Sequence, residues 1–414
     1  MRSGVLDGDA AVLERIRARC LQGELIVKLS TRADHTGLCA ELQQVPDPQS
    51  ALHAYTSIID LVPCFSFFSP VLPPYLVTPS SPTPTKIPFE SHRELHRYLS
   101  TALCRAAILS ARTPNANTQT LRILRTYHAY ATTWTATFKP LQRQRMLQLY
   151  IRALFTAFPK PNTAPIVPYT LDASIPNPSM SARALWRREA SDALRTGRAL
   201  LSATTSFPRA GSINAPVTQF CNLIVALAER CSVLQPEVIE TLWWAMTLTF
   251  QSQPILRHLT RLQTSQGQIL AARKTFELYV QLVLKARETQ QPEISLQLKR
   301  RPTDDHPAGP DQIAKEAEEA QEDDGPRARQ VQVAETEVDD DAQFIEALLV
   351  GSRLLLKDLG EIEEAWRYAS LAGEVVENAR SSSRKIYPAL RAEVEAVKGI
   401  VRMTMGSKGA FLEY

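Results

Sequence analysis

Several features that mark common protein classes are missing from this chain of 414 residues. Glycine is scarce, with 15 residues, and no phosphate-binding glycine loop, nucleophile elbow, zinc-protease motif or kinase motif set occurs. The six cysteines include no CxxC pair, and the N-terminal stretch lacks the uninterrupted apolar run of a secretory signal. We therefore expect a cytoplasmic protein with reduced thiols, no cofactor, no bound metal and no enzymatic activity.

A long uninterrupted apolar run is also missing. The most apolar stretch, "LVPCFSFFSPVLPPYLV" (61–77), is slightly short of a membrane span and is broken by four prolines. Any membrane association is therefore expected to be peripheral.

What the chain does contain favours helices. Leu, Ala, Arg, Glu and Gln are abundant, and the 28 prolines cluster between the helical stretches instead of spreading evenly. One of the expected helices covers Asn117–Thr137. The composition predicts an all-α protein with proline-rich connectors.

Charge is distributed unevenly along the chain. The net charge is +4, but residues 301–341 hold 14 acids and 4 bases, a local charge of −10, so the remainder carries +14. A basic body with an acidic loop suggests acidic partners or an anionic membrane surface, and a solvated loop that aids solubility is the simpler interpretation. Nucleic-acid binding is not expected, because the bases are scattered and no reader motif occurs.

These shifts in composition divide the chain into consecutive segments. They are an N-terminal helical segment (1–62), a Pro-rich linker (63–89), a helical block (90–158), a second Pro-rich linker (159–180), a helical block with a tetratricopeptide-like unit (181–289), an acidic disordered loop (290–341) and a tetratricopeptide-like helical block (342–414).

The stretch "HLTRLQTSQGQILAARKTFELYVQLVLKA" is helical on both sides of a glycine. Counted as a helix–turn–helix unit, Leu256 and Leu259 lie in the first helix and Gly267 in the turn. Ala272 then occupies the close-contact position of the second helix, followed by Phe276. A small residue lets two antiparallel helices approach, and a turn glycine adopts the left-handed conformation that ends the first helix. This pattern matches a tetratricopeptide repeat.

A second copy occurs in "ALLVGSRLLLKDLGEIEEAWRYASLAGEVV". The corresponding positions are Leu349, Leu356, Gly360, Ala365, Ala369 and Ala372. Both copies depart from the consensus, because the small residue expected in the first helix is Thr260 in one and Arg353 in the other. The pattern predicts a right-handed α-solenoid of antiparallel helix pairs with disordered linkers; the alternative is a generic helical bundle.

Candidate binding residues are the rigid aromatics of these blocks, since such side chains often anchor interfaces. They are Trp243, Trp244, Tyr279, Trp366 and Tyr368. Core packing is the competing interpretation for each, and one of the two adjacent tryptophans is expected in the core.

Two further patterns have weaker functional interpretations. His92 and His96 are spaced to share a metal on one helix face, but no further ligand is nearby, and surface or hydrogen-bonded polar roles fit better. The basic amphipathic stretch Leu141–Lys160 could lie on anionic lipid, but its apolar stripe would serve equally as a core face with solvated arginines.

Four segments together resemble one family. They are "TYHAYATTWTATFKPLQRQRMLQLYIRALF", "ETLWWAMTLTFQSQPILRHLTRL", "ARKTFELYVQLVLKARETQ" and "EEAWRYASLAGEVVENA". They are similar to the fungal tetratricopeptide cargo-transport or filamentation proteins, which resemble the repeat scaffold subunit of the plasma-membrane phosphatidylinositol 4-kinase complex. The resemblance covers most of the chain from about Leu95 onward.

Membership of that family would imply a non-enzymatic adaptor at the plasma membrane. Its partners would be a phosphatidylinositol 4-kinase and a membrane-anchored adaptor, with a role in endocytosis or cargo transport. Family members are usually longer, so the ending "MTMGSKGAFLEY" is consistent with a truncated gene model or a fragment. The alternatives are a tetratricopeptide adaptor of a chaperone or transport complex, and a metal-dependent helical enzyme centred on His92 and His96.

Overall fold

The protein is all-α. A computed structural model describes residues 2–36, 48–62, 89–113, 117–159, 181–209, 212–250, 252–290, 339–381 and 386–412, and every regular element within these ranges is a helix. This confirms the fold class expected from composition. The two Pro-rich linkers and nearly all of the acidic loop lie outside the described residues, so their predicted disorder stays a prediction.

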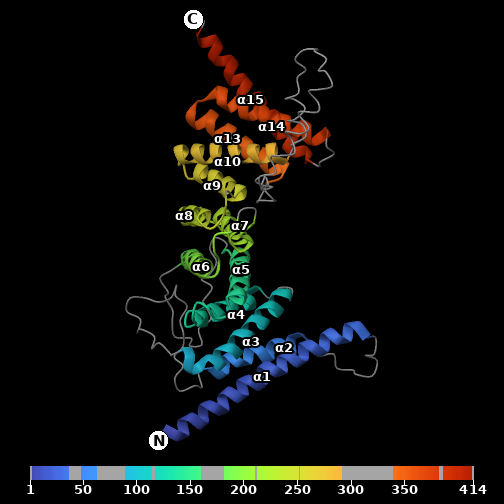
Figure 1. Ribbon diagram of the computed structural model, residues 1–414, viewed down its shortest axis with the longest axis vertical. Coiled ribbons are helices and arrows are strands. Elements are labelled where there is room, and N and C mark those ends of the chain that lie inside the picture. The colour runs from blue at the N-terminus through green and yellow to red at the C-terminus, as the bar shows by residue number, and fades with distance from the viewer. Residues whose placement is uncertain are drawn as a thin grey trace, which may run out of the picture. The chain divides into compact units, whose positions relative to one another are not determined.

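The chain divides into two compact units. Unit 1 comprises Met1–Thr205 and Asn222–Val238, and unit 2 comprises Ser206–Cys221 and Ile239–Tyr414. Unit 1 contains α1 (Arg2–Thr36), α2 (Pro48–Leu61), the 3₁₀ helices η3 (Phe89–His92) and η4 (Ser232–Leu234), α3 (Arg93–Arg112), α4 (Asn117–Ala131), α5 (Pro140–Thr156) and α6 (Ala182–Thr204) (Figure 1). Unit 2 contains α9 (Gln253–Ser265), α10 (Ile269–Gln290), α13 (Asp341–Leu354), the π-helical turn η5 (Leu355–Leu359), α14 (Ile362–Ser381) and α15 (Pro388–Leu412). Helices α7 (Ala215–Arg230) and α8 (Gln235–Met246) contribute residues to both units.

Close packing joins the first three helices of unit 1. A Cβ atom on Gly23 of α1 would lie 2.6 Å from the ring of Tyr55 in α2, so only glycine admits that fully buried ring. Arg105 of α3 completes the contact, because its Nη1 lies 2.7 Å from Glu24 Oε1 and donates to Tyr55 Oη at 3.3 Å.

A buried ion pair connects α4 to α6. Arg125 donates through Nε and Nη2 to the two carboxylate oxygens of Glu189, both at 2.7 Å. The Tyr150 hydroxyl of α5 donates to the same carboxylate at 2.6 Å. With side chains 5% and 0% exposed, the pair is held in place by complementary bonds from three helices.

Helix α4 ends earlier than the sequence predicts, at Ala131 instead of Thr137. The Thr132 and Thr133 hydroxyls each donate to a carbonyl three residues back, Ala129 O and Tyr130 O, at 2.7 Å. These local bonds compete with continuation of the helix, and the chain turns there so that Trp134 is buried.

Unit 2 contains two helix pairs of similar build, α9 with α10 and α13–η5 with α14. Each pair is connected through a glycine with left-handed backbone, Gly267 at φ 71° and Gly360 at φ 69°, as expected of a turn glycine. Ala272 of α10 and Ala365 of α14 are fully buried where the helices meet.

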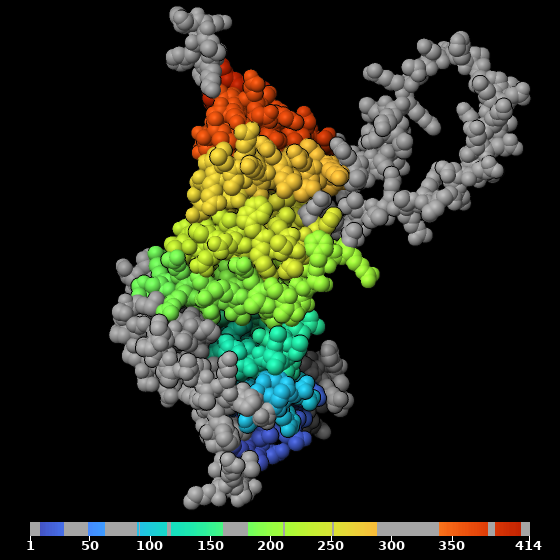
Figure 2. Space-filling model, turned by 60° about the vertical axis from the view of Figure 1, so that its left-hand side comes forward, coloured from blue at the N-terminus to red at the C-terminus, as the bar shows by residue number. Residues whose placement is uncertain are grey.

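Phe276 packs one pair on the next. Its ring, fully buried on α10, lies against Gly351 of α13, where an added Cβ would fall 2.1 Å from the ring. The same ring meets Tyr368 of α14 edge to face, with centroids 4.8 Å apart. In the space-filling view α9 and α10 (yellow) pack directly against α13 and α14 (orange to red) (Figure 2).

Candidate interaction surfaces

The residues predicted to define the repeats lie mainly in the core of unit 2. Leu256, Leu259, Leu349, Ala369 and Ala372 are at most 1% exposed. Leu356 differs, because it is half-buried while its neighbour Leu355 is 1% exposed. Leu355 follows the buried Gly351 by four residues, so it continues the buried face of α13, and the π-helical turn Leu355–Leu359 begins there.

The two positions that break the consensus are accommodated locally. Thr260 is buried, and its hydroxyl donates to Leu256 O at 3.0 Å, so its polar group is satisfied within α9. Arg353 is half-buried and pairs with Glu393 of α15 at 2.6 Å. The larger side chain thus contacts the next helix.

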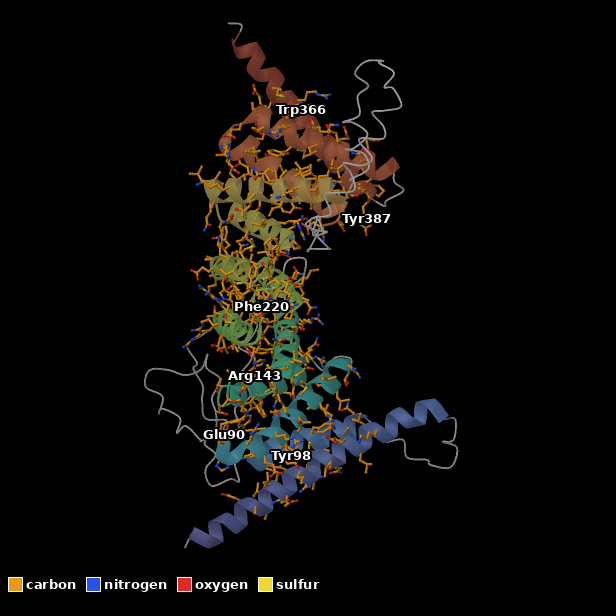
Figure 3. All side chains as sticks on the ribbon, viewed as in Figure 1. Glu90, Tyr98, Arg143, Phe220, Trp366 and Tyr387 are labelled. Carbon is orange, nitrogen blue, oxygen red and sulfur yellow. The ribbon has the colours of Figure 1, made fainter. Side chains whose placement is uncertain are left out.

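The five candidate aromatics are in different environments, and the structure does not bring them together. Trp243 is 45% exposed and Trp244 is half-buried. The prediction that one of the two fills the core is therefore wrong. Trp366 is half-buried beneath Arg402, whose guanidinium carbon lies 5.0 Å from its ring centroid (Figure 3). Tyr368 is half-buried against Phe276. Trp243 is the most accessible of these aromatics.

The prediction that Tyr279 contacts a partner is wrong, because its side chain is fully buried and fills the core. Its hydroxyl donates to Asp339 Oδ2 at 2.9 Å, and Arg257 holds the same carboxylate at 2.8 Å and 3.3 Å. Burial and the neighbouring Asp339 raise the pKa of Tyr279. Gln253 accepts from the Asp339 backbone N–H at 3.0 Å.

This network corrects the end of the acidic loop, which was expected to extend to residue 341. Asp339 is 4% exposed and Asp340 caps α13 through a reciprocal box with Gln343. Asp341 accepts from Arg287 at 2.7 Å. The final three acids therefore belong to the folded part of unit 2.

Sequence reasoning missed an exposed aromatic pair in unit 2. Phe207 and Phe250 are 53% and 40% exposed, and their rings meet edge to face with centroids 6.3 Å apart. Buried Asn214 holds the two segments together, since its Nδ2 donates to Leu248 O at 2.9 Å and Ser206 O at 3.4 Å. The sequence signal for this surface was Phe207, a large aromatic within the connector "SFPRAGSIN". Its partner Phe250 lies 43 residues away, so the pair could not be recognised from local sequence.

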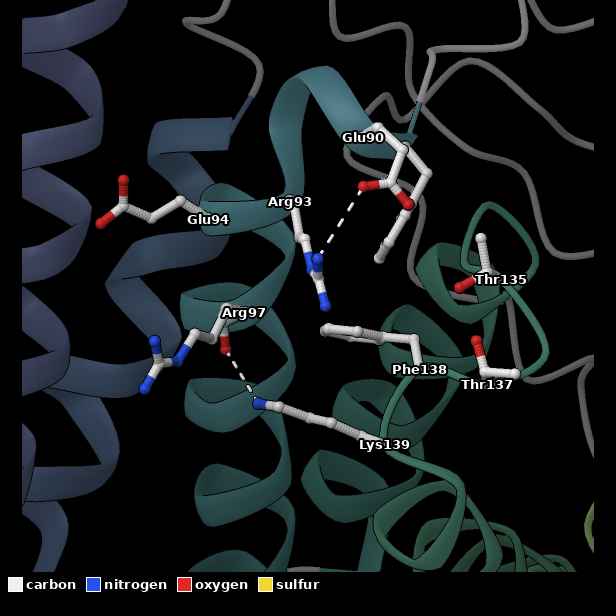
Figure 4. A pocket seen from close by; sticks show the side chains of 9 residues that line it. Glu90, Arg93, Glu94, Arg97, Thr135, Thr137, Phe138 and Lys139 are labelled. Atoms are coloured by element: carbon white, nitrogen blue, oxygen red, sulfur yellow. Dashed lines mark hydrogen bonds and ion pairs between the residues drawn. The ribbon is translucent and has the colours of Figure 1, made fainter.

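Unit 1 has an open pocket of about 770 Å³ (Figure 4). It is lined by Phe89, Glu90, Arg93, Glu94, Arg97, Thr135, Thr137, Phe138 and Lys139. Phe89 and Phe138 meet edge to face at 5.1 Å, and Arg93 lies 4.0 Å from Glu90. The lining holds three bases and two acids, and the Glu94 and Arg97 side chains point away from the pocket (Figure 4), so it carries only a small excess of positive charge.

Lys139 serves this pocket mainly as a structural residue. Its φ of 45° is the only left-handed backbone at a non-glycine residue in the described ranges. Its Nζ donates to Arg97 O at 3.2 Å and to the Ser100 and Thr101 hydroxyls at 2.8 Å. Burial, with the nearby Arg97 charge, lowers the pKa of Lys139. All three donors of the ammonium are used, so this side chain ties the turn to α3.

Of the two histidines, His96 is part of an aromatic cluster. His96 is fully buried, its Nδ1 accepts from Trp134 Nε1 at 3.1 Å, and its ring stacks on Phe89 at 5.2 Å. Burial lowers the pKa of His96 to about 4, with a smaller effect from His92. Within the described residues no group of three His, Cys, Asp or Glu side chains could hold a metal.

The apolar stripe of the basic stretch on α5 faces the core, as the core-packing interpretation of this stretch predicts. Leu147, Tyr150, Ile151 and Leu154 are buried and α5 packs on α4 and α6. Within the described ranges, none of the helices combines the length and the hydropathy that a membrane span requires.

Comparison of the chain with models of known protein families, with curated proteins and with solved structures finds no match.

Proposed function

We propose that the protein is a non-enzymatic scaffold, with unit 2 built as a right-handed solenoid of antiparallel helix pairs. The observation that carries the proposal is the position of Phe276, which contacts Gly351 and Tyr368 of the following pair. Stacking of one pair directly on the next is how solenoids bury a continuous core. Such an array presents an extended surface and has no bond-making step.

Partner binding would be anchored by the exposed aromatics of unit 2. Phe207 and Phe250 form a pair whose geometry is fixed by Asn214, so little side-chain freedom would be lost on binding. Exposed aromatic side chains of this kind are typical anchors of protein interfaces. Trp243, 45% exposed, is a further candidate anchor.

For the partners we propose a phosphatidylinositol 4-kinase and a membrane-anchored adaptor at the cytoplasmic side of the plasma membrane, serving endocytosis or cargo transport. This part rests on the sequence resemblance. A tetratricopeptide adaptor of a chaperone or transport complex is the second candidate, favoured by the same stacked pairs. The metal-dependent enzyme is less favoured, because His96 Nδ1 is bonded to Trp134.

The test is affinity purification of the full chain from a native cytosol and membrane extract, read by mass spectrometry and a lipid-kinase assay. Stoichiometric recovery of a lipid kinase supports the proposed partner. Recovery of another stable complex keeps the scaffold and replaces the partner. Recovery of no partner at all would contradict the scaffold function.

A further inference from the structure

Helix α15 has two separate apolar faces. It packs on α13 and α14 (Figure 1), and its packed face consists of side chains that are at most 8% exposed, namely Leu390, Val394, Val397 and Val401. At 100° per residue, six further residues fall within an arc of about 100° on another side of the helix. These six residues form the open face of α15: Ala389, Ala392, Ala396, Gly399, Ile400 and Met403.

The open face is apolar throughout and uncovered. All six residues are exposed, and the large side chains of Ile400 and Met403 are 49% and 70% exposed. From Ala389 to Met403 the face runs for about 21 Å, and no charged residue of α15 falls within its arc. An apolar stripe on a helix normally faces another helix, and exposed apolar patches mark protein interfaces.

The sizes of the side chains change along the open face. Its N-terminal half holds only alanines, Ala389, Ala392 and Ala396, whereas its C-terminal half holds Ile400 and Met403. In an antiparallel pair of two such helices, Ile400 of one copy lies opposite Ala396 of the other, and Met403 lies opposite Ala392. Large side chains then fill the space above small ones. A parallel pair would instead set large side chains against each other and alanine against alanine.

The charges beside the open face follow the same symmetry. Glu395 and Arg402 lie along one edge of it, about 40° and 60° beyond the arc. In an antiparallel pair with a twofold axis, this edge of one helix meets the same edge of the other. The register set by the side-chain sizes then places Glu395 of each copy opposite Arg402 of the other. Both side chains are exposed, Glu395 beside Lys398 at 3.0 Å and Arg402 over the Trp366 ring.

We propose that the open face of α15 binds the same face of a second copy of the chain, as an antiparallel helix pair. One register matches both the side-chain sizes and the bordering charges, and this self-complementarity selects a second copy over a helix of another protein. A twofold contact of this kind closes at two copies. The dimer carries two Phe207–Phe250 pairs, so one scaffold can hold two partner molecules.

Sedimentation equilibrium of the purified full chain, at concentrations from about 1 to 100 µM, measures the dimer. The main variant is Ala396→Glu, which places a charge in the middle of the open face. Its matched control is Ala11→Glu, the same change at an exposed alanine of α1. Two further variants test the register, Glu395→Arg and the charge exchange Glu395→Arg/Arg402→Glu. Circular dichroism checks that each variant is folded.

The parent chain is expected to dimerise in the micromolar range, with the dissociation constant raised about tenfold or more by Ala396→Glu and less than about twofold by Ala11→Glu. Glu395→Arg should weaken the dimer about three- to tenfold, because it sets two arginines against each other at both ends of the contact, and the charge exchange should restore it. These two charge variants provide the test if Ala396→Glu does not fold.

A parent chain that stays monomeric at about 100 µM would overturn the proposal and leave the open face to a helix of another protein. Equal weakening by Ala396→Glu and Ala11→Glu would place the dimer contact elsewhere and also overturn it. So would a charge exchange that fails to restore the dimer. Because no partner protein is present, failure here is distinct from failure of the scaffold proposal.

Discussion

At the scale of single residues, the structure depends on a few positions where only one kind of residue fits, for steric reasons or because a buried polar group is paired. Gly351, Asn214 and Glu189 each serve a contact with a segment far away in the chain. None of them stands out in the sequence, because periodicity reports only which face of a helix is buried. A buried glutamate such as Glu189, 0% exposed, is the opposite of what residue type suggests.

Buried histidines predict how stability depends on pH. Burial lowers the pKa values of His96, His128 and His258 to about 4, whereas an unfolded chain has a histidine pKa of about 6.5. Between these values the unfolded state binds protons that the folded state does not. The free energy of unfolding should therefore fall as pH drops from about 6.5 toward 4, by at most about 1.4 kcal/mol per pH unit for each histidine.

Urea unfolding at a series of pH values checks this expectation. His258→Gln should reduce the pH dependence, and His53→Gln, at an exposed position of α2, should not. A urea midpoint that stays constant or rises between pH 7 and 5 would contradict the assignment of these histidines as buried and neutral.

The Arg125–Glu189 pair predicts a large cost for loss of one charge. Glu189→Gln would leave the Arg125 guanidinium buried without a counter-charge, which costs about 3–5 kcal/mol. Glu14→Gln is the control, because its pair with Arg17 is exposed and contributes less than about 1 kcal/mol. Chemical denaturation followed by circular dichroism measures both, and equal small losses would show that the buried pair is not needed.

At the scale of elements, the sequence predicted the helix pairs of unit 2 but not the details of how their helices pack. The turn glycines Gly267 and Gly360 and the buried alanines were recognisable because they act within one helix pair. The burial of Leu355 in place of Leu356 was not, because Leu356 was assigned by matching the repeat pattern, whereas the buried face of α13 continues through Leu355. The end of α4 at Ala131 depended on the side-chain bonds of Thr132 and Thr133, which periodicity does not report.

Stacking of the helix pairs predicts opposite effects of two glycine substitutions. Gly351→Ala should destabilise the protein by about 1–3 kcal/mol, because the added methyl would overlap the buried ring of Phe276. Gly399→Ala in α15 should instead stabilise it by up to about 1 kcal/mol, because that position is exposed and its surroundings are open. Thermal unfolding measures both, and a Gly351→Ala variant as stable as the parent would contradict the stacking contact.

At the scale of the whole molecule, composition alone gave the all-α class and the uneven charge. It did not give the binding surface, since the Phe207–Phe250 pair depends on which part of a connector is left uncovered. Tyr279 illustrates the same limit, because an aromatic at helical spacing can anchor a partner or fill the core, and here it fills the core.

The central claim is that unit 2 holds a protein partner through its exposed aromatic pair. The most direct measurement is affinity purification of Phe207→Ser/Phe250→Ser beside the parent chain, with the amount of each co-purified protein quantified by mass spectrometry. Tyr387→Ser is the control, because Tyr387 is an aromatic of the same unit that is 75% exposed and directly precedes α15 (Figure 3).

The account predicts that the double variant keeps its fold and that the amount of the main partner recovered with it falls at least about tenfold, as expected for interface anchors. The Tyr387→Ser chain should recover as much as the parent. Undiminished recovery of every partner by the folded double variant would contradict the claim.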